Sequence, residues 1–483
     1  MFVRARLFAE QNRRWWTLVA VSFGLFMIML DNTVVNVALP SIRRDLGIGI
    51  SELEWVVNAY ALTFGVLLLS GGKLADLLGR RAIFIAGLLI FTGASLWCGL
   101  AGDATSLIAA RTVQGVGAAL MNPATLSIIT ATFPPRQRGT AIGIWAGVSA
   151  LALAFGPIVG GVLTQKVDWS WIFFVNIPVG IVGVAAAWIF IDESKDTSRE
   201  QRLDLPGLVS SGVGLFALTY GLIETNTHAW GSMRVLALFA VAALALATFV
   251  LLELRQRLPM LDLKLFRNPT FSGANTTMLL VGLAMFGIFF YNSLFLQNVL
   301  GYGAIATGAT FLPMTVLIIL VAPAAGKVTD TIGPRWLMGA GMALLASSLL
   351  LFGTLDANST FWNILPGLLV GGFGMAITMA PTTAAAMGAV PVDKAGVGSA
   401  VINSMRQVGG SLGVAIMGAI VATSVSVTPL DPRFAGQFVE GYHHALEFGA
   451  ALLLAGAVVA VLTVRPVPRA ETEAAAEAAV DVA

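Results

Sequence analysis

Long apolar runs separated by short charged segments make up most of the chain. Because an α-helix rises 1.5 Å per residue, about 20 apolar residues are enough to cross the hydrocarbon core of a bilayer. This criterion predicts fourteen membrane-spanning helices, and hence an all-α integral membrane protein. Their expected bounds are residues 16–38, 54–72, 82–101, 105–127, 139–163, 170–191, 205–223, 233–252, 272–295, 305–325, 337–354, 361–381, 397–423 and 443–464.

Composition agrees with this pattern. Of 483 residues, 57% are hydrophobic and only 11% are charged, whereas roughly a quarter of residues are charged in soluble domains. The single cysteine, Cys98, excludes a disulfide or a cysteine metal cluster within one chain. The three histidines, His228, His443 and His444, match no metal motif. We therefore expect no metal site, no cofactor and no nucleic-acid partner.

The distribution of basic residues predicts the orientation in the membrane. An even number of spans puts both termini on one side, and cytoplasmic loops are enriched in Lys and Arg. Of the 28 basic residues, 21 fall on the side of the termini, two fall within spans, and five fall opposite: Arg43, Arg44, Lys166, Arg234 and Arg433. Both termini are thus predicted to be cytoplasmic. The excess of Arg over Lys is typical of GC-rich bacterial genomes, so we expect a bacterial plasma (inner) membrane location.

An internal repeat predicts how the spans are grouped. The segment Gly72–Arg81 (GKLADLLGRR) returns as Gly326–Arg335 (GKVTDTIGPR). We infer a duplicated six-helix unit, with residues 1–195 and 269–465 as two bundles. Residues 196–268 form a two-helix insert with cytoplasmic linkers, and residues 466–483 form a cytoplasmic tail. Parallel repeats of this kind place a substrate site near the bilayer midplane, between the halves.

Four motifs carry a resemblance to a known family: Leu30–Pro40 (LDNTVVNVALP), Gly72–Arg81, Arg111–Gly117 (RTVQGVG) and Gly156–Gly161 (GPIVGG). With them the chain resembles the fourteen-helix drug:proton antiporter branch of the major facilitator superfamily over essentially its whole length. The resemblance implies a major facilitator fold of two six-helix bundles plus two inserted helices. It also implies export of small amphipathic drugs by alternating access, with the proton gradient as energy source and no cofactor.

Asp31 and Arg111 are the predicted proton-coupling residues. Asp31 is the one carboxylate that we place well inside a span, where an uncompensated charge is costly. At 1.5 Å per residue, Asp31 lies ~13 Å and Arg111 ~9 Å below the outer end of their spans, so the two side chains could pair. A purely structural ion pair remains the alternative. Asn36 and Gln114, in the same motifs, are candidates for the cavity lining.

Charged and glycine residues near the cytoplasmic ends are predicted to form a conformational gate. In the signature loop, Gly72 and Gly79 permit a tight turn, while Asp76 can accept hydrogen bonds from a helix terminus and pair with Arg80 or Arg81. The second copy has Thr329 and Pro334 where the first has Ala75 and Arg80, which predicts a weaker latch. Arg406 could contact the gate or anchor its helix at the interface. The gate candidates are Gly72, Asp76, Gly79, Arg80, Arg81, Asp330, Arg335 and Arg406.

Two further motifs are given mainly structural roles. Gly156, Pro157, Gly160 and Gly161 form the antiporter motif, which predicts a kinked helix that packs closely against a neighbour. Ser51–Glu54 is interpreted as a capping box that opens the second span. Its two glutamates are therefore expected to be structural.

The sequence holds no nucleophile elbow, no in-span pair of His and carboxylate and no phosphate-binding loop. We therefore predict a transporter and not an enzyme. Its expected partners are a small amphipathic molecule, protons and the lipid bilayer, and we expect a monomer. Two alternatives stay open, namely an exporter of one endogenous lipid or metabolite and a transport-dead membrane sensor or scaffold.

Overall fold

The computed structural model describes residues 10–195, 203–257, 259–390, 395–425, 431 and 433–465. All regular structure in these ranges is helical. The first group of helices comprises α2 (Glu10–Leu46), α3 (Ile50–Leu78), α4 (Arg80–Gly99), α5 (Ala104–Thr132), α6 (Pro135–Lys166), α7 (Trp171–Phe174) and α8 (Asn176–Phe190). The middle of the chain forms α9 (Leu205–Glu224), α10 (Met233–Arg255) and the short turn η1 (Leu263–Arg267).

The remaining helices belong to the second half of the chain. They are α11 (Pro269–Leu294), the turn η2 (Phe295–Val299), α12 (Ala304–Thr310), α13 (Leu312–Ile332), α14 (Pro334–Phe352), α15 (Phe361–Gly388), α16 (Ala395–Ser424) and α17 (Phe434–Thr463). Two predicted spans are each divided, one between α7 and α8 and the other between α12 and α13. The predicted tail 466–483 lies outside the described residues.

Twelve helices in the described ranges are long and apolar enough to cross a membrane, so the chain is a multi-pass membrane protein. The predicted spans 105–127 and 139–163 coincide with α5 and α6, which are not among the twelve. The 29-residue α5 is long enough, but it carries polar residues such as Arg111, Gln114 and Asn122. The predicted number of fourteen spans is therefore not confirmed.

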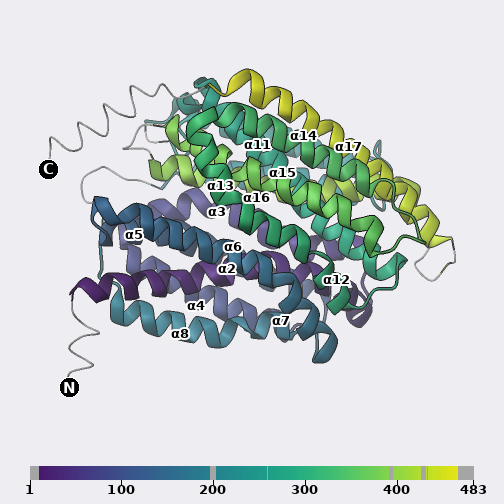
Figure 1. Ribbon diagram of the computed structural model, residues 1–483, viewed down its shortest axis with the longest axis horizontal. Helices are drawn as coiled ribbons and strands as arrows, with labels where there is room; N and C mark the ends of the chain where they lie inside the picture. The colour runs from purple at the N-terminus through teal and green to yellow at the C-terminus, as the bar shows by residue number, and fades with distance from the viewer. Residues whose placement is uncertain are drawn as a thin grey trace.

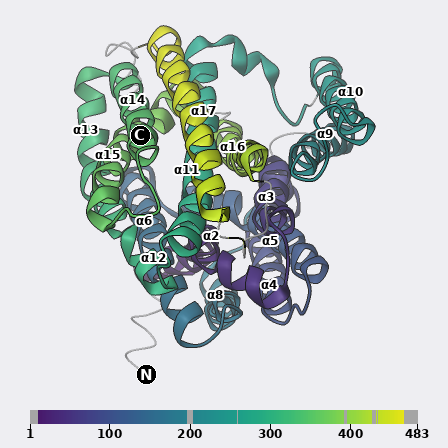
Figure 2. The same cartoon turned by 90° about the vertical axis from the view of Figure 1, so that its right-hand side faces the viewer.

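Helices from each end of the chain pack mainly among themselves. In Figure 1, α2, α4, α5, α6 and α8 lie in the lower part of the molecule, and α11, α14, α15, α16 and α17 lie above them. Between these groups, α2 contacts α11, α6 contacts α12, and α3 contacts α16. The α9–α10 pair packs against α3 and α16 through α9, and Figure 2 shows it at one side of the molecule.

The signature motif is more helical than expected. Residues Gly72 to Leu78 continue α3, and the turn is confined to Gly79, whose φ of 118° strongly favours glycine. Gly333, at the equivalent place in the second copy, has a φ of 85°. The prediction of a tight turn is correct at Gly79, while the prediction of a loop from Gly72 is wrong because the helix simply continues.

The predicted capping box at the start of α3 is also wrong by two residues. The N-cap residue is Gly49, and Glu52 accepts a hydrogen bond from the Gly49 N–H at 3.0 Å. Ser51 is already inside the helix. This earlier start places Glu54 in the second turn of α3, where its side chain is fully buried.

Candidate functional site

Asp31 and Arg111 form a buried ion pair. Asp31 comes from the middle of α2 and is 0% exposed, while Arg111 comes from α5 and is 1% exposed. The distance from Arg111 Nη1 to Asp31 Oδ2 is 2.5 Å. The structure therefore brings together the two residues that the sequence singles out, and their role in proton coupling stays a prediction.

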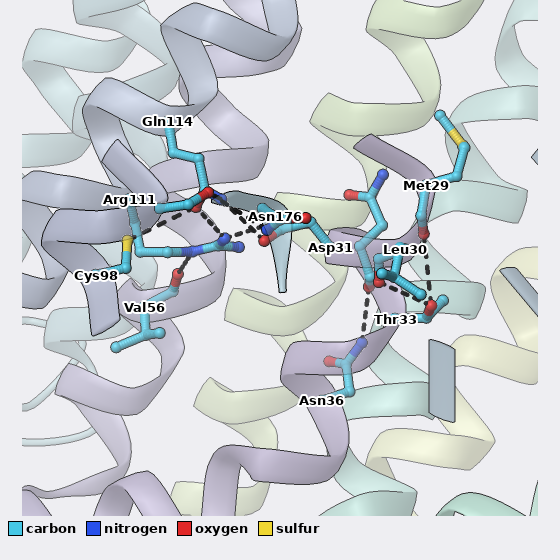
Figure 3. Close-up of polar contacts among 12 residues, drawn as sticks. Met29, Leu30, Asp31, Thr33, Asn36, Val56, Cys98, Arg111, Gln114 and Asn176 are labelled. Carbon is cyan, nitrogen blue, oxygen red and sulfur yellow. Dashed lines mark hydrogen bonds and ion pairs between the residues drawn. The ribbon is translucent and has the colours of Figure 1, made fainter. Parts of the chain in front are cut away.

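Gln114 holds this pair together from one turn further along α5. Its Oε1 accepts a hydrogen bond from Arg111 Nη1 at 2.6 Å, and its Nε2 donates to Asp31 Oδ1 at 3.0 Å and to Ser95 Oγ of α4 at 2.9 Å. Figure 3 shows Gln114 beside Arg111 and Cys98. The predicted cavity residue Gln114 is thus engaged with the ion pair.

The rest of the Arg111 side chain is enclosed by α3 and α7. Its Nε donates to the Val56 carbonyl at 3.0 Å. Its guanidinium lies 4.3 Å from the ring centre of Tyr60 and 5.7 Å from that of Phe173. These contacts compensate the loss of hydration that a buried guanidinium suffers. The whole cluster is built from helices of the first half of the chain.

Asn36 lies apart from this cluster, although it is only five residues from Asp31. Its Nδ2 donates to the Asn32 carbonyl at 3.0 Å, and its backbone carbonyl accepts from Ser293 Oγ of α11 at 2.7 Å. The side-chain Oδ1 is buried without a hydrogen-bond partner. Asn36 therefore sits where α2 meets the second half of the chain.

The glycines of the antiporter motif join α6 to two different helices. A Cβ at Gly156 would overlap Thr33 Oγ1, and one at Gly160 would lie 2.7 Å from the Val34 carbonyl oxygen, both on α2. A Cβ at Gly161 would lie 2.6 Å from the Ala304 carbonyl oxygen on α12. Pro157 lies within α6 as expected. The motif thus connects the helix that carries Asp31 with the other half of the chain.

Some of the residues predicted for the cytoplasmic gate contact neighbours in the first half, and the gate itself stays a prediction. Asp76 Oδ1 and Arg80 Nη2 form a salt bridge of 3.0 Å, and the Arg81 guanidinium lies 4.9 Å from the ring centre of Trp188. Gly72 faces Pro123. The start of α4 is capped by Glu193, which sequence reasoning missed: its carboxylate accepts the N–H groups of Arg81 and Ala82.

Three gate candidates belong to helices of the second half. Arg335 lies 4.9 Å from the ring centre of Trp336, as Arg81 does from Trp188. The side chain of Asp330 lies outside the described part of the chain. Arg406 is half-buried twelve residues into α16, and its Nε has no hydrogen-bond partner. Its role as a gate contact or as an interfacial anchor stays a prediction.

A second buried carboxylate, Glu54, was missed as a functional residue. It is 0% exposed. Tyr291 Oη donates to Glu54 Oε1 at 2.7 Å, and Asn226 Nδ2 donates to Glu54 Oε2 at 3.2 Å. With α3 starting at Ile50, Glu54 falls four residues before the buried Asn58, on the same helix face. That spacing is the signal that could have identified it.

Other buried polar atoms near the contact of the two halves have no hydrogen-bond partner. Within the described ranges they include the side chains of Asn58 and Tyr60 on α3, Thr277 on α11, and Gln407 and Ser411 on α16. These helices pack against one another, α3 on α16 and α11 on α16. Because buried polar groups are normally satisfied, this surface is a candidate for contact with a polar group of a substrate.

The comparisons with known proteins agree with the fold. A family model described as Major Facilitator Superfamily matches residues 21–414. The tetracenomycin C resistance and export protein of Streptomyces glaucescens is 36% identical over 86% of this chain and 77% of its own length. The multidrug resistance protein Stp of Mycobacterium tuberculosis is 37% identical, with the same two coverages. A puromycin resistance protein of Streptomyces alboniger is 35% identical over 93% of this chain and 91% of its own.

A solved structure supports the architecture alone. A bacterial homologue of the human lysosomal transporter Spinster superposes with a TM-score of 0.68, covering 94% of this chain and 97% of its own. Its sequence identity is 16%. The similarity therefore lies in the arrangement of the helices.

Proposed function

Because the chain belongs to the major facilitator superfamily, we propose that it is a secondary active transporter that exports small amphipathic drugs or antibiotics in exchange for protons by alternating access. The single observation that carries this proposal is the buried Asp31–Arg111 pair with its Gln114 bridge. A carboxylate in this setting changes from a charged partner to a neutral one when it takes up a proton. Proton uptake is thereby linked to the position of α2.

A proton on Asp31 removes the charge balance between Asp31 and Arg111. While Asp31 is ionised, Arg111 is held between Asp31, Gln114 and the Val56 carbonyl. Protonation removes the charge that compensates the guanidinium, and a buried cation without its partner is costly. The helices that carry the pair then rearrange. After Asp31 releases its proton again, a cationic part of a substrate competes with Arg111 for the ionised carboxylate.

Movement of α2 would reach the other half of the chain directly. We define the outer junction as three hydrogen bonds: Ser293 Oγ to the Asn36 carbonyl (2.7 Å), Gln297 Nε2 to the Val37 carbonyl (2.9 Å), and the Ile305 N–H to Gln165 Oε1 (2.9 Å). By the predicted topology they lie toward the outer face. In the proposed cycle these bonds break when the transporter opens outward.

The proposed organisation keeps fourteen spans. In it α5 and α6 cross the membrane in addition to the twelve apolar helices, and residues 1–195 and 269–465 form the two moving bundles. The basic residues support cytoplasmic termini in a bacterial plasma membrane. The transporter works as a monomer, with the proton gradient as its energy source and without a cofactor.

Support for drugs or antibiotics as substrates comes from the names of the relatives, which include tetracenomycin C and puromycin resistance proteins. Export of one endogenous lipid or metabolite is the alternative within transport. The unsatisfied polar atoms on α3, α11 and α16 suit either substrate class. A transport-dead sensor would have no need of the costly buried pair.

The test is efflux of the fluorescent lipophilic cation ethidium from energised whole cells, with and without a protonophore. Asp31→Asn should abolish proton-driven efflux, because an amide cannot exchange a proton. The matched control is Asp45→Asn, the same change at an exposed position of the same helix. Wild type and Asp45→Asn should both export dye and lose export when the protonophore is added.

Three results would contradict parts of the proposal. Export by Asp31→Asn that ignores the protonophore would exclude the coupling role of Asp31. Export by wild type that ignores the protonophore would exclude proton antiport altogether. If wild type exports no dye and its expression protects cells against none of the antibiotics tested, a single endogenous substrate would be favoured.

A further inference from the structure

The carboxylate of Glu54 lies where three parts of the chain meet. Glu54 itself belongs to α3 of the first half, and Tyr291 belongs to α11 of the second. Asn226 follows α9 of the inserted pair. Gly418 of α16 supplies the space, because a Cβ at this position would overlap Glu54 Oε1. The carboxylate oxygens of Glu54 therefore keep their hydrogen bonds only while these three parts of the chain stay together.

No Lys, Arg or His in the described ranges forms an ion pair with Glu54. The charged groups on the surrounding elements have other partners or lie far along their helices. Glu224 at the end of α9 pairs with Arg234 and His228, each at 3.0 Å. Arg406 lies twelve residues before Gly418 on α16, ~18 Å along the axis.

Several other charged residues of the first half also have partners other than Glu54. On α3 itself, the exposed Glu52 accepts the Gly49 N–H. Arg111 of α5 pairs with Asp31 of α2, and Arg80 of α4 pairs with Asp76. At the other end of α2, Asp45 accepts a hydrogen bond from Trp169 Nε1, and Arg44 donates to Ser41. Arg43 lies outside ion-pair distance of Glu54. The contacts of Glu54 are thus Tyr291 and Asn226, which are both neutral.

A protonated Glu54 fits this environment better than an ionised one. Two neutral hydrogen-bond donors do not compensate a full charge that has lost its water, whereas a neutral carboxylic acid needs only hydrogen bonds. The Oδ1 atom of Asn226 is buried and has no partner. Because the two ends of an asparagine amide are assigned from hydrogen bonding, rotation of this amide lets Oδ1 accept the proton of the acid. Asn226 and Tyr291 can therefore serve both protonation states.

We propose that Glu54 is a second proton-binding site, occupied while the halves are closed at this end and emptied to the outer side when they open. The proposal rests on the alternating access proposed above, but it does not depend on Asp31. Opening separates α3 from α11 and α16 and exposes the carboxylate to water, where it ionises. By the predicted topology Glu54 is near the outer end of α3. Its proton therefore comes from and returns to the outside, so Glu54 controls closure and is not a carrier.

The experiment measures closure without measuring transport. Spin labels are placed at Arg44→Cys and Asn298→Cys, two exposed positions at the ends of α2 and of η2, in full-length Cys98→Ala protein in lipid nanodiscs. Pulsed electron paramagnetic resonance then gives the distance between the two spin labels at each pH of a series. If one proton stabilises the closed form, the ratio of open to closed molecules rises with pH by up to about tenfold per pH unit.

Glu54→Gln imitates the protonated acid and should stay closed at every pH of the series. Glu54→Asp keeps a carboxyl group and should retain a pH response, which separates loss of the proton from misfolding. The matched control is Glu52→Gln, which preserves the capping hydrogen bond and should respond as wild type does. Asp31→Asn should keep the response that Glu54→Gln loses.

The proposal is overturned if Glu54→Gln responds to pH as wild type does, or if the wild-type distance is independent of pH. The drug-export proposal fails on a different measurement, since dye efflux can be absent while the pH-dependent distance remains. Conversely, export with an unchanged pH optimum in Glu54→Gln would contradict the second site and leave proton-coupled export standing.

Discussion

The two buried carboxylates of this protein, Asp31 and Glu54, are compensated in different ways. Asp31 has an arginine at 2.5 Å, so its ionised form completes a neutral pair. Glu54 has only a tyrosine hydroxyl and an asparagine amide as partners, which are both neutral. Its ionised form would therefore leave an uncompensated buried charge, whereas its protonated form leaves none. The same conformation therefore favours one carboxylate with its charge and the other with its proton. Burial alone does not determine which form a carboxylate takes, because the partner decides it.

The two sites also differ in what they connect. The Asp31 cluster is built within the first half of the chain, from α2, α3, α4, α5 and α7. Glu54 joins the first half to Tyr291 of α11 and to Asn226, two residues after the end of α9. A proton on Asp31 thus changes a contact inside one bundle, and a proton on Glu54 changes a contact between bundles. This difference separates the coupling role from the closing role.

The largest effect is expected for Arg111→Met. The substitution leaves Asp31 buried without a cation, and breaking a buried pair from one side costs about 3–5 kcal/mol. Thermal unfolding of the purified protein should show this loss near neutral pH and a partial recovery at acidic pH, where Asp31 becomes protonated. The double variant Asp31→Asn/Arg111→Met should recover most of the stability without recovering proton-driven efflux. Equal stability of Arg111→Met and wild type would show that Asp31 carries no charge in the folded protein.

Gly161→Ala is expected to affect the junction and leave the ion pair intact. A Cβ at Gly161 would lie 2.6 Å from the Ala304 carbonyl oxygen, and overpacking of this kind costs roughly 1–3 kcal/mol. The labels at residues 44 and 298 should then report a larger open fraction, and closure should need a lower pH. The control Gly147→Ala, in the same helix with no atom within 4 Å of its Cβ position, should behave as wild type. An open fraction in Gly161→Ala equal to that of wild type would show that the α6–α12 contact has no influence on the closure that Glu54 is proposed to control.

The sequence predicted the Asp31–Arg111 pair because a charged residue inside an apolar run is conspicuous and because helix rise gives its depth. It failed at Glu54 for two physical reasons. The capping-box interpretation moved the helix start to Ser51 and assigned Glu54 to the cap, although Gly49 and Glu52 fill those positions. In addition, Tyr291 is 237 residues away in the chain, and such a contact has no local signal. The bridging role of Gln114 was hidden for a related reason, because motif membership does not reveal side-chain direction.

The smallest effect is expected for Tyr291→Phe, which removes one neutral hydrogen bond from Glu54 and keeps the shape of the ring. A hydrogen bond of this kind contributes about 1 kcal/mol, so the protein should fold and remain responsive to pH. Infrared difference spectra between acidic and alkaline pH should contain the carbonyl band of a protonated acid that Glu54→Gln abolishes.

In Tyr291→Phe this band should move to higher frequency, because the carboxyl group has lost its donor. Tyr442→Phe is the matched control, since Tyr442 is equally buried but bonds to Asn292. It should leave the band in place, as should Asp45→Asn. If the band instead disappears in Asp31→Asn and survives in Glu54→Gln, the buried proton belongs to Asp31. The two carboxylates would then have exchanged the roles that their partners assign to them.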